Sequence, residues 1–371
     1  MIRLAILSTH PIQYNAPLFR QMAEQEDWEV HVFFSRTLKQ VSYDPDFQRE
    51  VTWDIPLTIG YAHSHIDANV SSGIETLKRS IEAFKPQALL VYGWNFPGHR
   101  QVMRAFHGRV PIGFRGDSHL LDAMPFWRRW VRQTVLRRVY RHVDLALSVG
   151  TANTAYFQWS GIPESRITQA PHAVENVYWR KYPAERKKAA EQWKAELGIP
   201  VTASVIGFAG KLEPLKQVGL LIQAFDLVSS PNAHLVIAGT GPDEDALRRQ
   251  AAEQPQIHFI GFVNQSRMPI FYRMLSVFTL PSSSETWGLS VNEALACGTR
   301  CMVSDRVGCG TDLFRDSNLG AIVPWDRPSE WAPILDNMLD HPDIEGDSLQ
   351  AFMKTYSYQA MLDVLPKLWS A

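Results

Sequence analysis

The sequence predicts an α/β protein of two domains, each an open parallel sheet covered by helices. Short apolar runs alternate with longer helical patterns along the chain, which is typical of parallel strands joined by crossover helices. The alternation starts again after the polar stretch 181–194, so we expect a domain boundary between Tyr178 and Pro200. A chain of 371 residues is also too long for one ordinary core and suits two domains.

The predicted elements follow this alternation in both halves. In the first half we expect strands at 3–8, 29–34, 88–92, 111–114 and 145–149, with helices over segments such as 16–24, 72–84 and 127–142. In the second half we expect strands at 204–209, 234–238, 258–260, 277–280, 300–304 and 321–323, and a closing helix at 358–369. Two such sheets in tandem create a cleft at the carboxyl ends of their strands, where these folds bind ligands.

Composition excludes several classes of protein. The formal net charge is −1, so no overall field attracts the chain to nucleic acid or to a membrane. No apolar run reaches the roughly 18 residues of a transmembrane helix. Polar residues follow directly after residues 1–7, so we expect no apolar core of a signal peptide there. Cys297, Cys301 and Cys309 are spaced unlike a zinc site, so we expect buried free thiols and a cytoplasmic location.

The strongest functional pattern follows the predicted strand 277–280. The strand runs into a loop of small polar residues, Gly288 opens a short helix, and Gly298 closes it. Free backbone N–H groups and the positive end of the helix dipole would face the cleft at Gly288, Leu289 and Ser290. The pattern therefore predicts a seat for a phosphate.

Two glutamates accompany this helix. Glu285 lies in the loop before it, and Glu293 lies about one turn inside it. Two carboxylates placed so differently can accept charge-assisted hydrogen bonds from different parts of one ligand, and sugar and ribose hydroxyls are suitable donors. The alternative is an ordinary strand–loop–helix unit with one solvated glutamate and one that complements the helix dipole.

Two lysines follow the first strand of the second domain. Lys211 and Lys216 flank a turn after residues 204–209, at the carboxyl end of the strand. Two ammonium groups there could neutralise a leaving diphosphate without a metal ion. Lysine pairs are common on surfaces, so the pair alone is weak evidence. Its position at the carboxyl end of the strand favours the functional interpretation.

A glycine turn at Gly239 and Gly241 follows the strand at 234–238. It would let a nucleotide approach the backbone closely, although a purely structural turn is the alternative. The spacing lacks the third glycine of the dinucleotide fingerprint, which argues against an NAD enzyme.

These elements, in this order, resemble the donor-binding domain of glycosyltransferase family 4, which has the GT-B fold. Glu285 and Glu293 form the E-x7-E pattern of the family, and Gly210-Lys211 with Lys216 matches its Gly-Arg…Lys segment. The resemblance is good over about residues 200–325, and within this range Cys309-Gly310-Thr311-Asp312 matches a later family loop only loosely.

The resemblance implies an α/β fold of two facing Rossmann-like domains with a cleft between them. Residues 1–180 would bind the acceptor and residues 181–355 the nucleotide sugar. Residues 356–371 would return as a helix to the first domain.

The resemblance also implies roles for individual residues. Glu293 would hold the ribose and Glu285 the transferred sugar, while Lys211 and Lys216 would hold the diphosphate. Val263 falls where the family seats the base.

The activity implied is that of a retaining, metal-independent glycosyltransferase with no cofactor. It would move a sugar from a nucleotide diphosphate donor to a glycan or lipid-linked acceptor, in bacterial surface polysaccharide or glycolipid synthesis. The leaving phosphate would help to deprotonate the acceptor. Asp44-Pro45-Asp46 has the Asp-x-Asp spacing of metal-dependent transferases, but it lies in a proline-bearing loop and predicts a solvated turn.

Two other functions stay open. A nucleotide-sugar 2-epimerase shares the architecture, but it needs acids and bases suited to elimination and does not predict the E-x7-E pattern. A non-catalytic nucleotide-sugar-binding protein would keep the contacts of Glu293 and Lys216 without turnover.

The first domain departs from the family pattern. Where relatives often carry a glycine pair after the first strand, this chain has His10 and its neighbours. The cleft histidine of the family corresponds to Asp117 or His119, and the sequence does not decide between them. Cleft function and structural polar contacts remain alternatives for these residues.

The segment 126–141 carries six arginines and several aromatic residues, with no acidic residue before Asp144. Such a segment can lie on an anionic membrane, here the inner face, or bind acceptor phosphates. The alternative is a solvated basic face over a packed helix.

Overall fold

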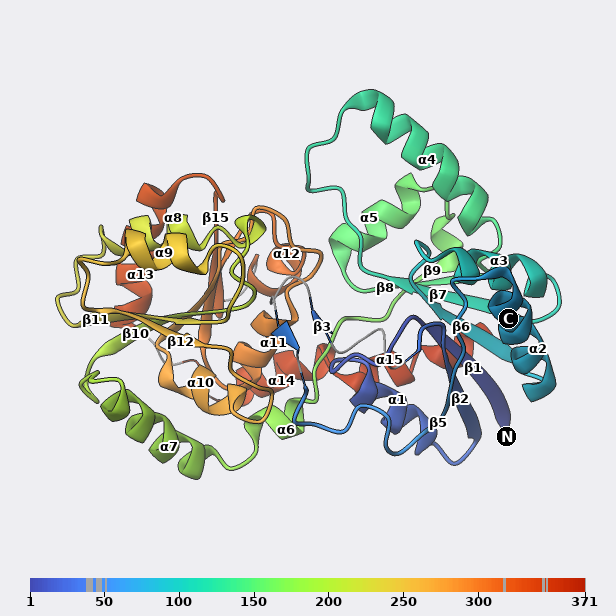
Figure 1. Ribbon diagram of the computed structural model, residues 1–371, viewed down its shortest axis with the longest axis horizontal. Coiled ribbons are helices and arrows are strands. Elements are labelled where there is room, and N and C mark those ends of the chain that lie inside the picture. The colour runs from blue at the N-terminus through green and yellow to red at the C-terminus, as the bar shows by residue number, and fades with distance from the viewer. Residues whose placement is uncertain are drawn as a thin grey trace. The chain divides into compact units, whose positions relative to one another are not determined.

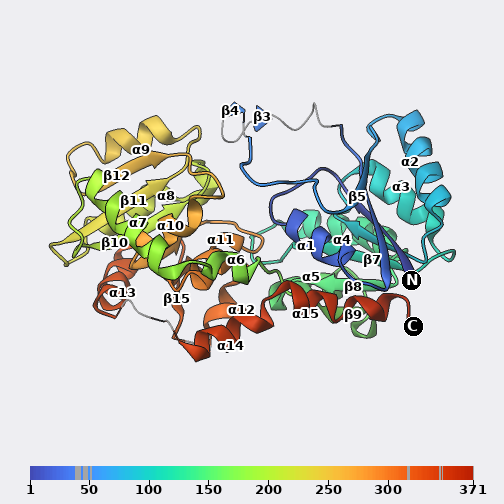
Figure 2. The same cartoon turned by 90° about the horizontal axis from the view of Figure 1, so that it is seen from below.

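The computed structural model describes residues 1–37, 43–44, 49–50, 52–315, 318–341, 344 and 346–370. The chain forms two compact units (Figures 1 and 2). Unit 1 comprises Met1–Ser42, Ile55–His172 and Ser357–Ala371, and unit 2 comprises Tyr43–Asp54 and Ala173–Tyr356. The main division at His172 and Ala173 falls before the predicted boundary. Among the described residues, no helix has the length and apolar character needed to cross a membrane.

Unit 1 is built on a parallel sheet of seven strands in the order β5-β2-β1-β6-β7-β8-β9. The strands are β1 (Ile2–Ser8), β2 (Trp28–Phe34), β5 (Ala62–His65), β6 (Ala88–Tyr92), β7 (Ile112–Gly116), β8 (Leu145–Ser148) and β9 (Ile167–Gln169). The five predicted strands are present. The sequence analysis missed β5 and β9, because these short edge strands carry little apolar pattern.

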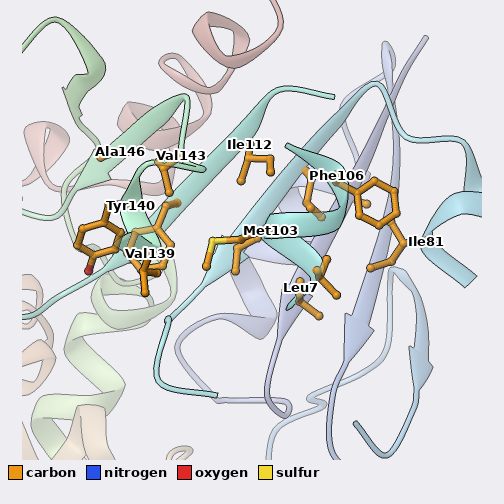
Figure 3. Close-up of a cluster of buried hydrophobic side chains, with 14 of the residues drawn as sticks. Leu7, Ile81, Met103, Phe106, Ile112, Val139, Tyr140, Val143 and Ala146 are labelled. Carbon is orange, nitrogen blue, oxygen red and sulfur yellow. The ribbon is translucent and has the colours of Figure 1, made fainter. Parts of the chain in front are cut away.

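The α-helices of unit 1 that precede Ala173 are α1 (Ala16–Ala23), α2 (Ser71–Phe84), α3 (Pro97–Phe106), α4 (Phe126–Tyr140) and α5 (Thr151–Trp159). Apolar residues of α2 to α5 pack on one face of the sheet, where alternate strand residues such as Leu7 and Ala146 point (Figure 3). The core thereby fixes α3 and α4 against the central strands. Both helices matter for a surface pocket described below.

The chain returns to unit 1 at its carboxyl end. The predicted helix at 358–369 is instead two pieces, α15 (Tyr358–Leu362) and a 3₁₀ turn at Leu365–Leu368 with Pro366 near its start. Proline lacks the N–H that a continuing α-helix needs, which accounts for the break. The Tyr358 hydroxyl donates to the Tyr14 carbonyl over 3.1 Å, and the Trp369 ring meets the Trp28 ring edge-on at 5.2 Å.

Unit 2 is built on a parallel sheet of six strands in the order β12-β11-β10-β13-β14-β15. The strands are β10 (Ser204–Ala209), β11 (Ala233–Ala238), β12 (Ile257–Gly261), β13 (Val277–Leu280), β14 (Arg300–Ser304) and β15 (Gly320–Val323). All six correspond to predicted strands. Residues 43–44 (β3) and 49–50 (β4) form a small antiparallel pair. Asp44 thus ends a short strand that the sequence analysis did not expect, and Pro45 and Asp46 lie outside the described residues.

Nine helices of unit 2 lie within the described residues: α6 (Asn176–Arg180), α7 (Pro183–Glu196), α8 (Val218–Phe225), α9 (Glu244–Gln250), α10 (Met268–Met274), α11 (Leu289–Ala296), α12 (Gly310–Phe314), α13 (Pro328–Asp340) and α14 (Asp347–Thr355). The polar stretch 181–194 is therefore largely helix α7, which buries Ala190 and Trp193 and packs against α10. All three cysteines are buried free thiols, as predicted.

The close approach of two loops leads to a stability prediction for Gly239. Its φ is +144°, and a Cβ there would lie 1.8 Å from the Gly210 carbonyl oxygen. Gly239→Ala should lower the free energy of unfolding by at least about 3 kcal/mol, because backbone atoms must move. Gly198→Ala is the matched control: φ is +73° with open space around it, so strain of only about 1–2 kcal/mol is expected. Urea unfolding measures both, and equal losses would contradict the steric explanation.

Candidate functional site

The site in unit 2 begins with a reversal of strand order. The chain adds β11 and then β12 on one side of β10, and β13 returns to pair with β10 on its other side. The loops after β10 and β13 therefore leave the same sheet edge side by side and in different directions. In open α/β sheets this position is where ligands bind.

These two loops are joined by direct contacts. The Ser283 N–H donates to the Leu215 carbonyl over 2.8 Å, and the Lys216 ammonium forms an ion pair with the Glu285 carboxylate. The side chains of this pair are only 17% and 19% exposed. The structure thus brings together two residues that the sequence analysis selected from separate motifs 69 positions apart.

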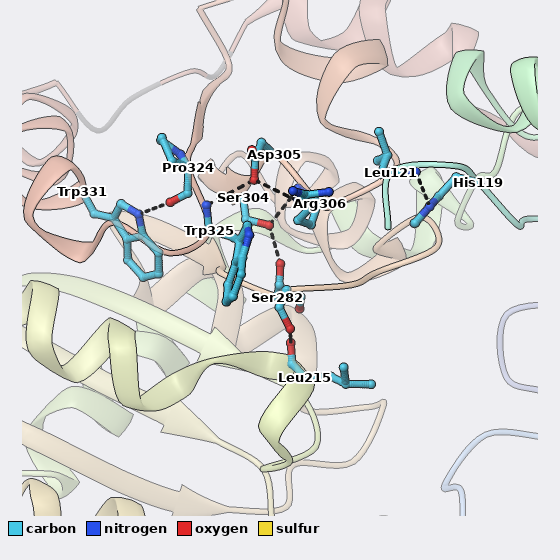
Figure 4. A network of polar contacts seen from close by, with 11 residues as sticks. His119, Leu121, Leu215, Ser282, Ser304, Asp305, Arg306, Pro324, Trp325 and Trp331 are labelled. Carbon is cyan, nitrogen blue, oxygen red and sulfur yellow. Dashed lines mark hydrogen bonds and ion pairs between the residues drawn. The ribbon is translucent and has the colours of Figure 1, made fainter. Parts of the chain in front are cut away.

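Further hydrogen bonds hold the neighbouring loops at this edge (Figure 4). The Ser304 hydroxyl donates to the Ser282 carbonyl and accepts from the Arg306 N–H at 3.2 Å. The Trp325 N–H reaches the Asp305 carboxylate at 3.2 Å. Loops after β13, β14 and β15 therefore form one connected rim.

The predicted helix after this loop is present as α11. Its N-cap is Gly288, whose φ of +95° lies in the region that favours glycine, and Gly298 follows its end with φ of +86°. Leu289 and Ser290 form its half-buried first turn. The Trp287 indole N–H donates to the buried Asn292 side chain over 2.8 Å, which anchors the loop that precedes the helix.

The side chain of Glu293 belongs to the core and is only 2% exposed. Its carboxylate accepts a hydrogen bond from the Tyr272 hydroxyl at 2.7 Å and another from the Gln265 amide at 3.2 Å. We therefore expect Glu293→Ala to destabilise the fold. Alanine would leave a cavity and two buried donors without their acceptor.

Burial raises the pKa of Glu293 from 4.5 to about 7, although the hydrogen bonds from Tyr272 and Gln265 lower it. Both partners donate, so their geometry suits the carboxylate, while the lack of solvent favours the neutral acid. Tyr272 and Gln265 were missed by the sequence analysis. No local motif marks either residue, because Tyr272 reaches Glu293 through the packing of α10 against α11 and Gln265 reaches it from the loop after β12.

Close packing explains why the turn after β11 carries glycine at positions 239 and 241. Cβ atoms at these positions would lie 1.8 Å from the Gly210 carbonyl oxygen and 2.4 Å from the Leu212 carbonyl oxygen. The Leu212 N–H also donates to Thr240, at 2.9 Å. Glycine is therefore required by the close packing of the loop that carries Lys211, which is half-buried.

Val263 is half-buried in the loop after β12, and a short segment from the first part of the chain contacts this loop. The Asn264 amide donates to the Thr52 carbonyl over 2.8 Å, and the Ser266 N–H donates to the Asp54 carboxylate at 3.1 Å. The Trp53 ring lies 6.1 Å from the Phe262 ring. No sequence motif indicated that residues 52–54 would restrain the loop that carries Val263.

In unit 1, the three residues selected from the sequence follow strand ends on one edge of the parallel sheet. His10 follows β1, and its Nδ1 lies 2.9 Å from the Thr9 hydroxyl. Asp117 and His119 follow β7. His119 is buried, and its Nδ1 accepts the Leu121 N–H at 3.2 Å (Figure 4). This bond is a structural contact, and Asp117 is the more open of the two.

The sequence analysis missed Arg115, a buried cation next to Asp117. Its guanidinium donates to the carbonyls of Ala170 at 2.6 Å and Pro171 at 3.2 Å. Burial lowers its pKa, while Tyr92 and Asp117 raise it. Arg115 thereby ties the ends of β7 and β9 together and fixes the loop that carries Asp117 and His119.

No group of three or more His, Cys, Asp or Glu side chains within the described ranges is placed to hold a metal ion. The unit 2 edge instead offers ammonium groups, a helix N-terminus and carboxylates. Such groups can bind a diphosphate and the hydroxyls of sugars.

Comparison with known proteins identifies the second half of the chain. Residues 189–359 match the family "Glycosyl transferases group 1", and the resemblance to family 4 is confirmed over this part of the chain. D-inositol 3-phosphate glycosyltransferase of Corynebacterium glutamicum is 30% identical over 203 residues, which cover 51% of this chain and 48% of that protein. The enzyme of the same name from Acidothermus cellulolyticus is 32% identical over 195 residues, covering 48% and 42%. The chain thus spans about half or less of the length of these relatives.

Solved structures extend the comparison to the whole chain, but for the fold only. Sucrose-phosphate synthase from Thermosynechococcus elongatus has a TM-score of 0.76 at 15% identity and covers 100% of this chain and 98% of its own. Anabaena Alr3699/HepE, in complex with UDP and glucose, has a TM-score of 0.73 at 16% identity and covers 100% of both chains. These matches confirm the predicted fold class, GT-B with two Rossmann-like domains.

The raised pKa of Glu293 predicts a pH-dependent effect of Glu293→Gln on stability. In the unfolded chain this carboxyl ionises near 4.5, and in the folded chain it ionises near 7. Its contribution to stability is therefore fully present below the lower value and lost as the pH rises through the higher one. From about pH 5 to pH 8, wild type should lose roughly 2–3 kcal/mol relative to Glu293→Gln.

Urea unfolding of both proteins at each pH measures this difference. Tyr272→Phe removes a hydrogen bond that stabilises the carboxylate, so it should move the pH midpoint upward. A difference between wild type and Glu293→Gln that does not change with pH would contradict the assignment.

Proposed function

We propose that the chain is a retaining glycosyltransferase that moves a sugar from a nucleotide diphosphate donor to a glycan or lipid-linked acceptor. The observation that carries this proposal is the pairing of Lys216 with Glu285 at the strand-order reversal of unit 2. This pairing lies in the segment that matches the group 1 glycosyl transferases. A sugar and a diphosphate are neighbours in such a donor, and so are the two side chains that would bind them.

The proposed donor site uses these residues in distinct roles. Lys216, Lys211 and the N-terminus of α11 at Gly288–Ser290 would hold the diphosphate. Glu285 would turn from Lys216 to the sugar hydroxyls, and Glu293 would accept hydrogen bonds from the ribose. The loop at Val263 would lie against the base. HepE was solved with UDP and UDP-glucose, which supports a uridine donor as the first to test.

The proposed reaction breaks the bond between the anomeric carbon and the diphosphate oxygen. Negative charge grows on the diphosphate as this bond breaks, and Lys216 stabilises it more in the transition state than in the ground state. The acceptor oxygen attacks the same face of the sugar, and its proton passes to the departing phosphate. Retention follows from this geometry, and Asp117 or His119 would only position the acceptor.

A lipid-linked acceptor is supported by the surface of α4. Phe126, Trp127 and Trp130 are 84%, 61% and 62% exposed, and arginines lie between them. Exposed aromatic and basic side chains on one helix are typical of segments that lie on anionic membranes. We propose that the enzyme acts on the inner membrane face, in bacterial surface polysaccharide or glycolipid synthesis.

The two rival functions make different demands on the same site. A 2-epimerase would form a free glycal or an isomerised donor without any acceptor. A non-catalytic binding protein would be stabilised by the donor but release no nucleoside diphosphate. Product analysis with and without acceptor separates the three functions.

Kinetics of Lys216 variants test the donor site. The donor is first chosen as the UDP-, GDP- or ADP-sugar that most stabilises the chain against heat, since a bound ligand stabilises by mass action. Lys216→Ala should then lower kcat by roughly 100-fold or more, with a smaller change in KM. Glu285→Gln should also slow transfer, and the double variant should lose less than the product of the two factors, because the side chains are in contact.

Lys187→Ala is the control, because Lys187 is exposed on α7 and is not among the residues assigned to the proposed site. It should leave kcat and KM unchanged. If Lys216→Ala keeps near-native kcat and KM, the donor site is assigned wrongly.

Activity should also survive chelation of metal ions. The two lysines and the helix N-terminus supply the positive charge that Mg²⁺ or Mn²⁺ supplies in metal-dependent transferases. Transfer is measured before and after treatment with EDTA and dialysis. Loss of turnover that Mn²⁺ restores would overturn the metal-independent mechanism.

A further inference from the structure

A basic pocket lies in unit 1, whereas the residues assigned to the donor belong to unit 2. It has a volume of about 520 Å³ and lies between α3 and the carboxyl-terminal half of α4. None of its lining residues is acidic, and four are arginines: Trp94, Arg100, Arg104, Val135, Arg138, Val139, Arg141 and His142.

The arginines come from two helices and converge on one hollow. The Arg100 guanidinium is held by the carbonyls of Trp94 at 3.2 Å and Asn95 at 2.8 Å. Arg104, Arg138 and Arg141 are exposed. Like charges gathered at one place repel one another, and a bound anion would relieve this repulsion. Guanidinium groups match phosphate oxygens with paired hydrogen bonds.

His142 adds a donor to the pocket. The Arg141 Nε–H donates to His142 Nε2 over 3.2 Å, so the ring proton of the neutral imidazole lies on Nδ1. That Nδ1 is buried and has no hydrogen-bond partner among the residues that the structure describes. Burial lowers the pKa of His142, and Arg141, His107 and Arg104 lower it further. A buried N–H without an acceptor is unusual, and an oxygen of a bound anion would satisfy it.

An apolar stripe leads along α4 to this pocket. Trp127, Val131 and Val135 follow one another at helical spacing and are 61%, 47% and 42% exposed. Val135 also lines the pocket, so the apolar stripe and the basic hollow are continuous. This combination matches a ligand that has an anionic head and apolar chains.

We propose that the pocket binds the phosphomonoester headgroup of an anionic lipid, whose acyl chains cover the stripe on α4. A monoester presents three terminal oxygens to a concave set of arginines, whereas a phosphodiester presents only two. The inference rests on the proposed function only for the role of this lipid binding, which is to hold the enzyme near a lipid-linked acceptor. Binding itself requires no turnover.

Vesicle flotation of the full-length chain tests the proposal. Phosphatidylcholine vesicles carry either phosphatidic acid or phosphatidylglycerol, adjusted to equal surface potential. Wild type should bind the phosphatidic acid vesicles several-fold more tightly. The double variant Arg104→Gln/Arg138→Gln should lose that preference, because it removes two of the guanidinium groups that would bind the monoester oxygens. It should also weaken binding to both kinds of vesicle, by roughly fivefold for each arginine removed near the surface.

Arg128→Gln/Arg129→Gln is the matched control, because it removes the same charge from exposed positions of α4 that do not line the pocket. It should weaken binding to both kinds of vesicle and keep the preference for phosphatidic acid. Equal binding of both vesicles by wild type would overturn the proposal, and so would a pocket variant that keeps the preference.

Soluble glycerol 3-phosphate distinguishes a lipid from a free phosphate. If it binds as tightly as the vesicles do, the pocket serves a soluble ligand and the lipid proposal is wrong. Thermal stabilisation by the donor is measured in parallel, and it should be the same for wild type and the pocket variant. Vesicle preference without transfer would overturn the proposed function alone.

Discussion

The return of β13 to the free side of β10 is the constraint on which the candidate donor site depends. Because β10 and β13 are neighbours, the loops that follow them start side by side and run in different directions. The hydrogen bond from the Ser283 N–H to the Leu215 carbonyl joins these two loops. Lys216 and Glu285 then meet as an ion pair that is mostly shielded from solvent. Because a parallel sheet sends all its carboxyl ends to one edge, the glycine turn after β11 and the loop after β12 lie at the same edge.

Beneath this edge, Glu293 shows how a binding group can also be part of a core. Its carboxylate joins α11 to α10 through Tyr272 and to the loop after β12 through Gln265. A group that is both buried and hydrogen-bonded is held in one rotamer, so a ligand would meet an acceptor that is already oriented. The same burial raises the pKa of the carboxyl to about 7, so both its neutral and its ionised form are populated near neutral pH. Binding and stability are therefore coupled at this residue.

Much of this structure followed from pattern alone, for identifiable reasons. Central strands such as Ala88–Tyr92 and Val277–Leu280 are fully or mostly apolar runs, and they were predicted to the residue. Edge strands such as Ala62–His65 carry no such run and were missed. In the site, Glu285 and Lys216 stand in recognisable motifs, whereas Gln265 and Arg115 act through partners distant in sequence. Only three-dimensional packing reveals residues of this second kind.

The path of the chain has a consequence for how the protein forms during synthesis. Unit 1 lacks its last part until Ser357–Ala371 has emerged from the ribosome, whereas unit 2 ends at Tyr356. Leu368 then packs onto Gly113, and Trp369 onto Trp28, at the side of a sheet whose strands were made first. Nascent chains usually complete their amino-terminal domain first. Here the sheet of unit 1 needs residues that follow Tyr356, so unit 2 is the first that can be complete.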